Sequence, residues 1–123
     1  MIDYTLDETN SVLNVRPTSP LQRDDFEALS RTVDPFIERT GGLNGLQLEV
    51  AQFPGWTNVA AAIRHFQFVR DHHRKIKKVA IVTDSPLGEA AERIASHFVA
   101  ATIKHFPAGH LDEAKTWLAS NVA

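Results

Sequence analysis

The segment from Gly45 to Ser85 constrains the fold of this chain more than any other part. It reads GLQLEVAQFPGWTNVAAAIRHFQFVRDHHRKIKKVAIVTDS. Alternating apolar residues over Leu46–Ala51 predict a strand, and helical periodicity predicts a helix over Asn58–Lys75. The apolar run Val79–Val82 is typical of a central strand that is buried on both faces. A strand, a helix and a second strand in this order form a βαβ unit with parallel strands, so the segment predicts an α/β fold.

The flanking segments extend this unit into one mixed sheet. Two short alternating runs, Ile2–Leu6 and Val12–Val15, predict an antiparallel hairpin. A helix is expected from about Pro20 to the Gly41-Gly42 stop, and Pro35 should kink or divide it. Three further elements are expected downstream: a helix that starts near Ser85, a strand containing residues 102–106, and a last helix containing residues 111–118. We predict one domain over residues 1–123, with about five strands and about four helices.

Composition excludes several classes of function. The chain has 123 residues, no cysteine and a net charge of −2. The lack of cysteine excludes disulfides, thiolate zinc sites and a cysteine nucleophile, and it fits a reducing cytosol. The weak negative charge argues against a nucleic-acid partner. The six histidines lack helical chelating spacing, and no phosphate-binding or nucleophile motif occurs. We therefore expect a cytoplasmic, non-enzymatic protein with no catalytic residue, no metal and no cofactor.

The helix over Asn58–Lys75 carries more apolar surface than one core stripe needs. We expect the core to be faced by a stripe of five apolar residues: Val59, Ala62, Ile63, Phe66 and Val69. Phe68 then falls on the opposite side of the helix, near His65 and His72. Two interpretations of Phe68 stay open. It packs under a neighbouring loop or in a homodimer interface, or it forms the wall of a ligand site.

A ligand site is expected at the carboxyl ends of the parallel strands, where open α/β sheets bind their ligands. Its predicted residues are Phe53, Trp56, Thr57, Phe68, Asp84 and Ser85.

A separate basic patch is predicted at the end of the helix and the start of the next strand. Its residues are Arg70, Arg74, Lys75, Lys77 and Lys78. These cations either complement the helix dipole or attract an anionic membrane surface or an acidic partner. They lie at the other end of the helix from Trp56.

Several motifs together resemble the SpoIIAA-like proteins of the STAS superfamily, which is named after sulfate transporters and anti-sigma factor antagonists. They are the run FPGW, the stretch FVRDHHRKIKKVAIVTDSP, the pattern from Phe98 to Pro107 and the closing E-A-x-x-W-L from Glu113 to Leu118. The resemblance covers nearly the whole chain and implies a mixed sheet with helices packed beside it. This branch is also similar to the CRAL-TRIO lipid-binding fold, which implies an apolar ligand pocket and membrane association.

One departure from the family pattern bears on function. Anti-sigma factor antagonists carry a phosphorylated serine in an Asp-Ser segment, and the matching residues 53–58 here, FPGWTN, contain no such pair. We therefore expect a binding module for a small apolar or lipid-like ligand, with peripheral docking on anionic membrane. The alternative is a regulatory protein–protein module of the STAS type that works without the serine switch.

Overall fold

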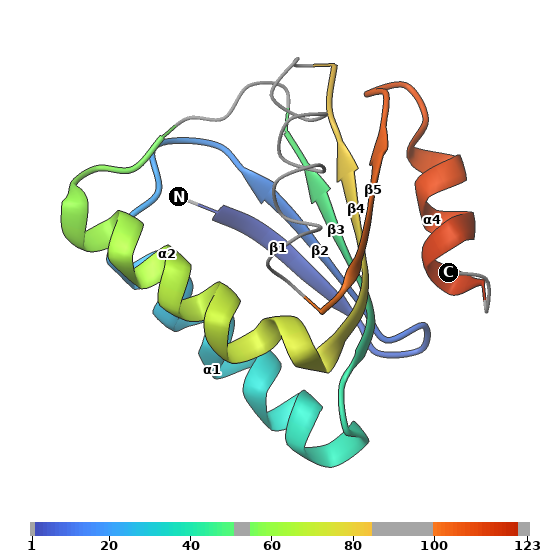
Figure 1. The fold of residues 1–123 in the computed structure, drawn as a ribbon, viewed down its shortest axis with the longest axis horizontal. Coiled ribbons are helices and arrows are strands. Elements are labelled where there is room, and N and C mark those ends of the chain that lie inside the picture. The colour runs from blue at the N-terminus through green and yellow to red at the C-terminus, as the bar shows by residue number, and fades with distance from the viewer. Residues whose placement is uncertain (1, 51–54, 85–99, 121–123) are drawn as a thin grey trace.

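The sheet matches the architecture that the sequence predicts. The structure, a computed structural model, describes residues 2–50, 55–84 and 100–120. Its described strands form one sheet in the order β1-β2-β3-β4-β5 (Figure 1). They are β1 (Ile2–Asp7), β2 (Val12–Pro17), β3 (Leu43–Glu49), β4 (Ile76–Val82) and β5 (Thr102–Phe106). β1 and β2 pair antiparallel, and every later pair is parallel, which confirms the hairpin followed by parallel crossovers.

Helices cover both faces of this sheet. α1 (Arg23–Thr40) and α2 (Val59–His72), which η1 (His73–Lys75) extends, lie side by side on one face. α4 (Leu111–Ala119) packs against β3, β4 and β5 on the other face (Figure 1). α1 runs without interruption through Pro35, so the expectation that this proline divides the helix is wrong. The helix expected to start near Ser85 lies outside the described residues.

Two hydrophobic clusters fill the spaces between the layers. The larger cluster joins α1 and α2 to the sheet and includes Phe26, Val33 and Phe68. The smaller cluster joins α4 to β2, β4 and β5 and includes Phe106 and Leu118. The sheet is therefore buried on both faces at its centre, as the continuous apolar run of β4 predicts.

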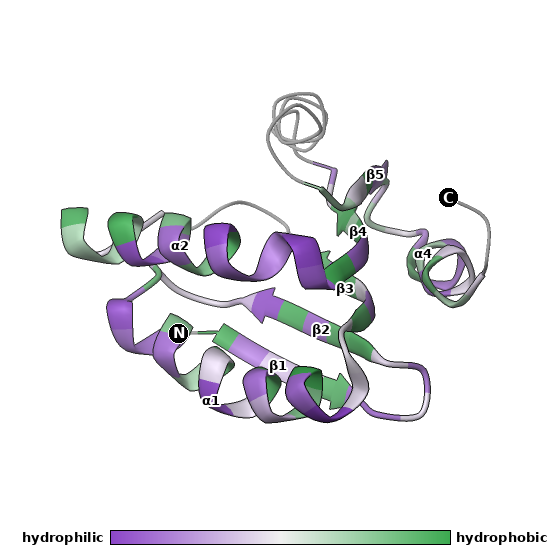
Figure 2. Cartoon of the chain, turned by 60° about the horizontal axis from the view of Figure 1, so that its bottom comes forward, coloured by the Kyte–Doolittle hydropathy of each residue, from purple (hydrophilic) through white to green (hydrophobic). Residues whose placement is uncertain are grey.

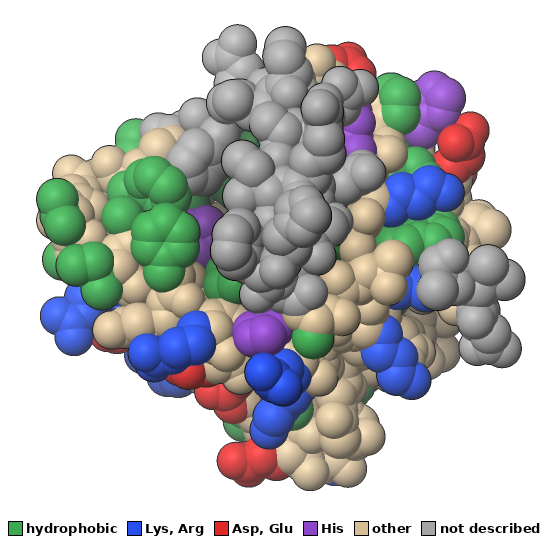
Figure 3. Space-filling view, viewed as in Figure 1, with side chains coloured by type: hydrophobic (Ala, Val, Ile, Leu, Met, Phe, Trp, Pro, Cys, Tyr) green, Lys and Arg blue, Asp and Glu red, His purple; other side chains and the backbone are tan. Residues whose placement is uncertain are grey.

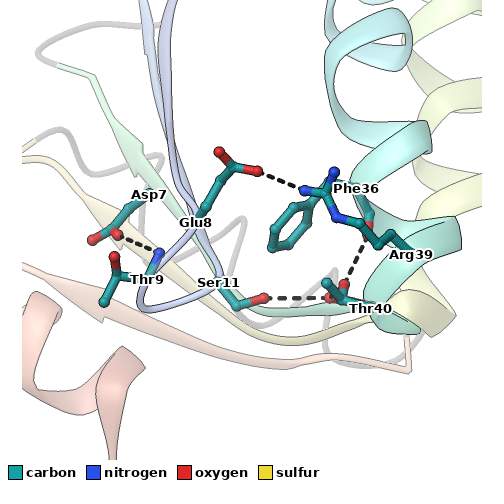
Figure 4. Close-up of polar contacts among 8 residues, drawn as sticks. Asp7, Glu8, Thr9, Ser11, Phe36, Arg39 and Thr40 are labelled. Atoms are coloured by element: carbon teal, nitrogen blue, oxygen red, sulfur yellow. Dashed lines mark hydrogen bonds and ion pairs between the residues drawn. The ribbon is translucent and has the colours of Figure 1, made fainter.

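The turn between β1 and β2 is fixed to the end of α1. Arg39 Nη2 lies 2.6 Å from Glu8 Oε1, and Ser11 donates a hydrogen bond to the carbonyl of Gly42 at 3.3 Å (Figure 4). Within the turn, the side chain and backbone of Asn10 donate to Asp7, which lowers the pKa of that carboxyl group. These contacts hold the hairpin against the helix that follows it.

α4 lies close to β3 because Gly45 has no side chain. A Cβ atom at this position would lie 2.6 Å from Leu118 Cδ2, far inside van der Waals contact.

Lys78, on β4, binds the end of α4 at the same interface. Its ammonium group donates to the carbonyls of Trp117 and Ser120 at 2.9 and 2.7 Å, and the residue is only 7% exposed. Lys78 therefore caps the end of α4, and its predicted place in an exposed basic patch is wrong.

The predicted core face of α2 is also wrong. Phe68 is 8% exposed and belongs to the larger cluster, whereas Val59, Ile63 and Phe66 are exposed to solvent. The reason is that two histidine rings serve as core groups on the inner side. His65 stacks on Phe26 with 4.7 Å between ring centroids, and His72 stacks on Phe68 at 4.1 Å. A periodicity argument that counts histidine as polar assigns the helix the opposite orientation.

Candidate functional site: an exposed apolar strip on α2

Four large apolar side chains gather on the outer side of α2 and at its start. Trp56, Val59, Ile63 and Phe66 are 37%, 74%, 52% and 65% exposed. We call them the α2 apolar strip. The spacing of Val59, Ile63 and Phe66 places them on one helical face. Figure 2 shows the hydrophobic colour in the first turns of α2, and Figure 3 shows apolar side chains gathered over the same end of the helix.

The chain before α1 fixes the loop that carries Trp56. The backbone N–H of Leu21 donates to the carbonyl of Gly55 at 2.7 Å, and the N–H of Thr57 donates to the carbonyl of Leu21 at 2.9 Å. Leu21 itself is buried in the larger cluster. Gly55 has φ of +81°, a conformation that residues with a Cβ seldom adopt. The two residues that flank Trp56, Gly55 and Thr57, are therefore both hydrogen-bonded to Leu21.

Trp56 is oriented by α2 as well. Its indole N–H donates to Nδ1 of His65 at 3.1 Å, and its ring centroid lies 6.1 Å from that of Phe66. Nδ1 can accept this bond only when it carries no proton. Burial lowers the pKa of His65, which favours the neutral ring, and the bond from Trp56 requires the tautomer whose proton is on Nε2. The tryptophan ring thus presents its apolar surface outward while its polar N–H is satisfied.

The first turn of α2 is closed by a side-chain cap. Asn58 Oδ1 accepts a hydrogen bond from the backbone N–H of Ala61 at 2.9 Å, so Asn58 is the N-cap residue of α2. Ala61 is fully buried against the core, which turns Val59 outward. The cap and the small inner residue together set the orientation of the α2 apolar strip.

Cations follow the strip along the same helix. Arg70 comes four residues after Phe66 on the same face and pairs with Asp71 at 3.1 Å. Arg74, Lys75 and Lys77 are exposed beyond it. Figure 3 shows Lys and Arg side chains near the apolar group and beyond it toward the end of α2. The outer face of α2 and η1 is therefore apolar at its start and basic at its end.

The structure separates several residues that the sequence placed in one ligand site. Trp56 and Thr57 lie in the anchored loop, while Phe68 is inside the core. Asp84 is exposed and accepts a hydrogen bond from the backbone N–H of Ala108 at 2.9 Å, which ties together the chain after β4 and the chain after β5. Phe53 and Ser85 lie outside the described residues. Exposed Val59, Ile63 and Phe66 are the residues that sequence reasoning assigned to the core instead.

A cleft of about 290 Å³ between α1 and α2 brings together Ser30, Asp34 and His72. His72 is engaged at both ring nitrogens, Nδ1 with the carbonyl of Phe68 at 2.7 Å and Nε2 with Asp34 Oδ1 at 2.6 Å. Neither nitrogen is left to accept a proton from Ser30, whose hydroxyl has no hydrogen-bond partner in the part of the chain that the structure describes. The cleft therefore does not form an activated nucleophile.

The described ranges contain neither a metal-binding cluster nor a membrane-spanning helix. Residues 2–50, 55–84 and 100–120 hold no group of three or more His, Cys, Asp or Glu side chains placed to bind a metal ion. In the same ranges, no helix has both the length and the apolar character needed to cross a bilayer.

Comparison with known proteins identifies the family. The model of the SpoIIAA-like family matches residues 12–119. The chain belongs to the SpoIIAA-like family. A solved structure, an uncharacterized protein with a SpoIIAA-like fold from Shewanella loihica PV-4, is similar to this SpoIIAA-like chain with a TM-score of 0.75 and 21% sequence identity. The match covers 96% of this chain and 92% of that one. No curated protein matches the chain at a significant level.

Membership of the family agrees with the fold and with a general role. The mixed sheet with helices packed beside it is the arrangement that the resemblance implies, and it is consistent with the STAS superfamily. A SpoIIAA-like fold of the STAS type supports a regulatory or binding module in general.

Proposed function

We propose that this SpoIIAA-like domain is a non-enzymatic binding module that docks on an apolar, lipid-like surface through the α2 apolar strip. The observation that carries the proposal is the exposure of Val59, Ile63 and Phe66 on one face of a helix whose opposite face is already packed. Scattered apolar side chains are normal on protein surfaces, but a contiguous group beside an exposed tryptophan is typical of an interaction site.

The chemistry of the strip favours a lipid surface. Tryptophan is suited to the boundary between headgroups and acyl chains, because its ring is apolar and its N–H is polar. An amphipathic helix with aromatic and aliphatic residues on one side and cations nearby binds in the plane of a membrane interface. Arg74, Lys75 and Lys77 supply exposed cations, each worth about 1 kcal/mol near an anionic surface.

Surface docking replaces the enclosed ligand site that the sequence suggested. Phe68 packs against Phe26 and His72, so it is not available as the wall of a ligand site beside Trp56. An apolar ligand would instead meet the outer side of α2. The proposal therefore concerns acyl chains at a surface, with Trp56 and Phe66 as the residues that enter them.

The proposal is tested by sedimentation of the full chain with vesicles of phosphatidylcholine, with and without phosphatidylserine. We expect binding to the anionic vesicles, and we expect Phe66→Asp to weaken it about tenfold or more, because one buried phenylalanine contributes about 2 kcal/mol. Gln67→Asp is the matched control. It adds the same charge at the next exposed position and removes no apolar side chain of the strip.

Two results would argue against lipid docking. One is the absence of sedimentation with either type of vesicle. The other is equal binding by the wild-type chain and Phe66→Asp. A protein partner that binds the wild-type chain, loses affinity for Phe66→Asp and is not displaced by lipid would instead support the alternative, a regulatory protein–protein module of the STAS type that uses the same strip.

A further inference from the structure

A second surface, on the opposite face of the sheet, has the features of a polar ligand site. α4 covers β3, β4 and β5 on this face, and the remaining area over β1, β2 and β3 forms an open groove of about 610 Å³. Asn14 and Gln47 lie on its floor as direct neighbours in the β2–β3 register. Thr5 is the neighbour of Asn14 in the β1–β2 register, so three hydrogen-bonding side chains form one row across the strands.

Two atoms in this row lack partners. The side-chain oxygens of Asn14 and Gln47 accept no hydrogen bond from the described part of the chain, and Gln47 is only 3% exposed. A buried amide without a partner is costly, so most buried polar groups in proteins are satisfied. Rotation of either terminal amide about its last torsion costs little and turns the oxygen or the nitrogen toward the groove. The floor can therefore both accept and donate hydrogen bonds.

The charges around the groove balance one another. Arg16 and Lys115 contribute two cations, and Asp3 and Glu49 contribute two carboxylates. Arg16 and Asp3 already form an ion pair at 3.6 Å across β1 and β2. The groove therefore has no net charge that would select an anion or a cation.

We propose that this groove binds a neutral polyhydroxylated molecule of about the size of a monosaccharide. A hydroxyl group both donates and accepts, as does the terminal amide of Asn or Gln, so adjacent hydroxyls match the row of Thr5, Asn14 and Gln47. The charged side chains at the rim strengthen such hydrogen bonds without adding a net charge. This site is independent of the α2 apolar strip, which lies on the other face of the sheet.

The test is a titration of the ¹⁵N-labelled full chain by nuclear magnetic resonance. The probes are glucose and myo-inositol as polyols, glycine betaine as a zwitterion and inorganic phosphate as an anion. We expect saturable shifts of the side-chain amide signals of Asn14 and Gln47 with at least one polyol, and weaker or no shifts with betaine and phosphate. Gln47→Leu identifies the Gln47 signals, because it removes them.

Two variants and one control decide the assignment. Thr5→Val and Gln47→Leu should each weaken the polyol about tenfold, since each removes a hydrogen bond to the ligand. Thr102→Val makes the same change as Thr5→Val on β5, outside the groove, and should bind like the wild-type chain. Thr5 is exposed, so its variant stays informative even if Gln47→Leu fails to fold.

Three results would overturn the proposal. They are the absence of saturable shifts with either polyol, preferential binding of betaine or phosphate at these signals, and equal polyol affinity in wild type, Thr5→Val and Gln47→Leu.

Discussion

Trp56 donates its indole N–H to Nδ1 of His65 across 3.1 Å, and this bond joins the exposed strip to the core. His65 in turn stacks on Phe26, a buried residue of α1. The exposed indole ring is therefore held by a histidine that carries no proton on the nitrogen that makes the contact. The orientation of Trp56 depends on the charge state of that ring.

Stability should fall in mild acid because of His65. Burial lowers the pKa of this histidine in the folded chain, so the unfolded chain binds the proton more readily. Its stabilising contribution is complete above the ordinary histidine pKa of about 6.5 and is lost as the pH falls toward and through the lowered value. Urea unfolding at about pH 7.5 and about pH 5.5 measures this loss.

His65→Gln is the control for the acid effect. Glutamine offers an acceptor oxygen to Trp56 and does not titrate, so this variant should lose less stability than the wild-type chain over the same pH interval. The variant leaves every other residue of the chain unchanged, so their contributions cancel in the comparison. An equal loss in the two proteins would contradict a role for His65.

The orientation of α2 is tested by two phenylalanines on the same helix. Phe68→Ala should lower the free energy of unfolding by about 3–5 kcal/mol, because it opens a cavity in the larger cluster. Phe66→Ala should change it by less than about 0.5 kcal/mol, because Phe66 is exposed. Urea denaturation measures both. A larger loss of stability for Phe66→Ala than for Phe68→Ala would show instead that Phe66 faces the core, as helical periodicity predicts.

Two neighbouring lysines on β4, Lys77 and Lys78, should differ in how much they contribute to stability, because only Lys78 is buried. Lys78→Met should destabilise the fold by about 1–3 kcal/mol, since the carbonyls of Trp117 and Ser120 would lose their donor. Lys77→Met, at an exposed position, should stay within about 0.5 kcal/mol of the wild-type chain. Thermal or urea unfolding separates the two variants, and an equal effect would contradict the capping role of Lys78.

Gly45 should tolerate no side chain. Gly45→Ala would place a Cβ atom against Leu118 and force α4 away from β3, at a cost of about 1–3 kcal/mol. Gly109→Ala meets no atom within 4 Å and serves as the control. A Gly45→Ala variant with the stability of wild type would show that α4 can shift freely.

The sequence predicts the sheet better than it predicts the surfaces. Alternation in β1 and β2 and the continuous apolar run of β4 are local signals, and the structure has a strand at each of these places. The orientation of α2 depends on which partners His65 and His72 find, and those partners come from α1. Periodicity contains no information about them.

Two other features depend on contacts between distant segments. Lys78 is buried because the end of α4 reaches it, a contact across 42 residues of sequence to Ser120. The polar row of Thr5, Asn14 and Gln47 exists only once the strand register aligns three separate segments. Neither feature has a sequence signature, because each residue alone is typical of an ordinary strand.

The central claim, that the α2 apolar strip docks on lipid, is tested most directly by the fluorescence of Trp56. Trp117→Phe leaves Trp56 as the single tryptophan of the chain. On vesicles that contain phosphatidylserine, its emission should shift to the blue and should be quenched by brominated acyl chains. An emission spectrum that stays unchanged with vesicles in excess, in a variant that remains folded, would contradict the account.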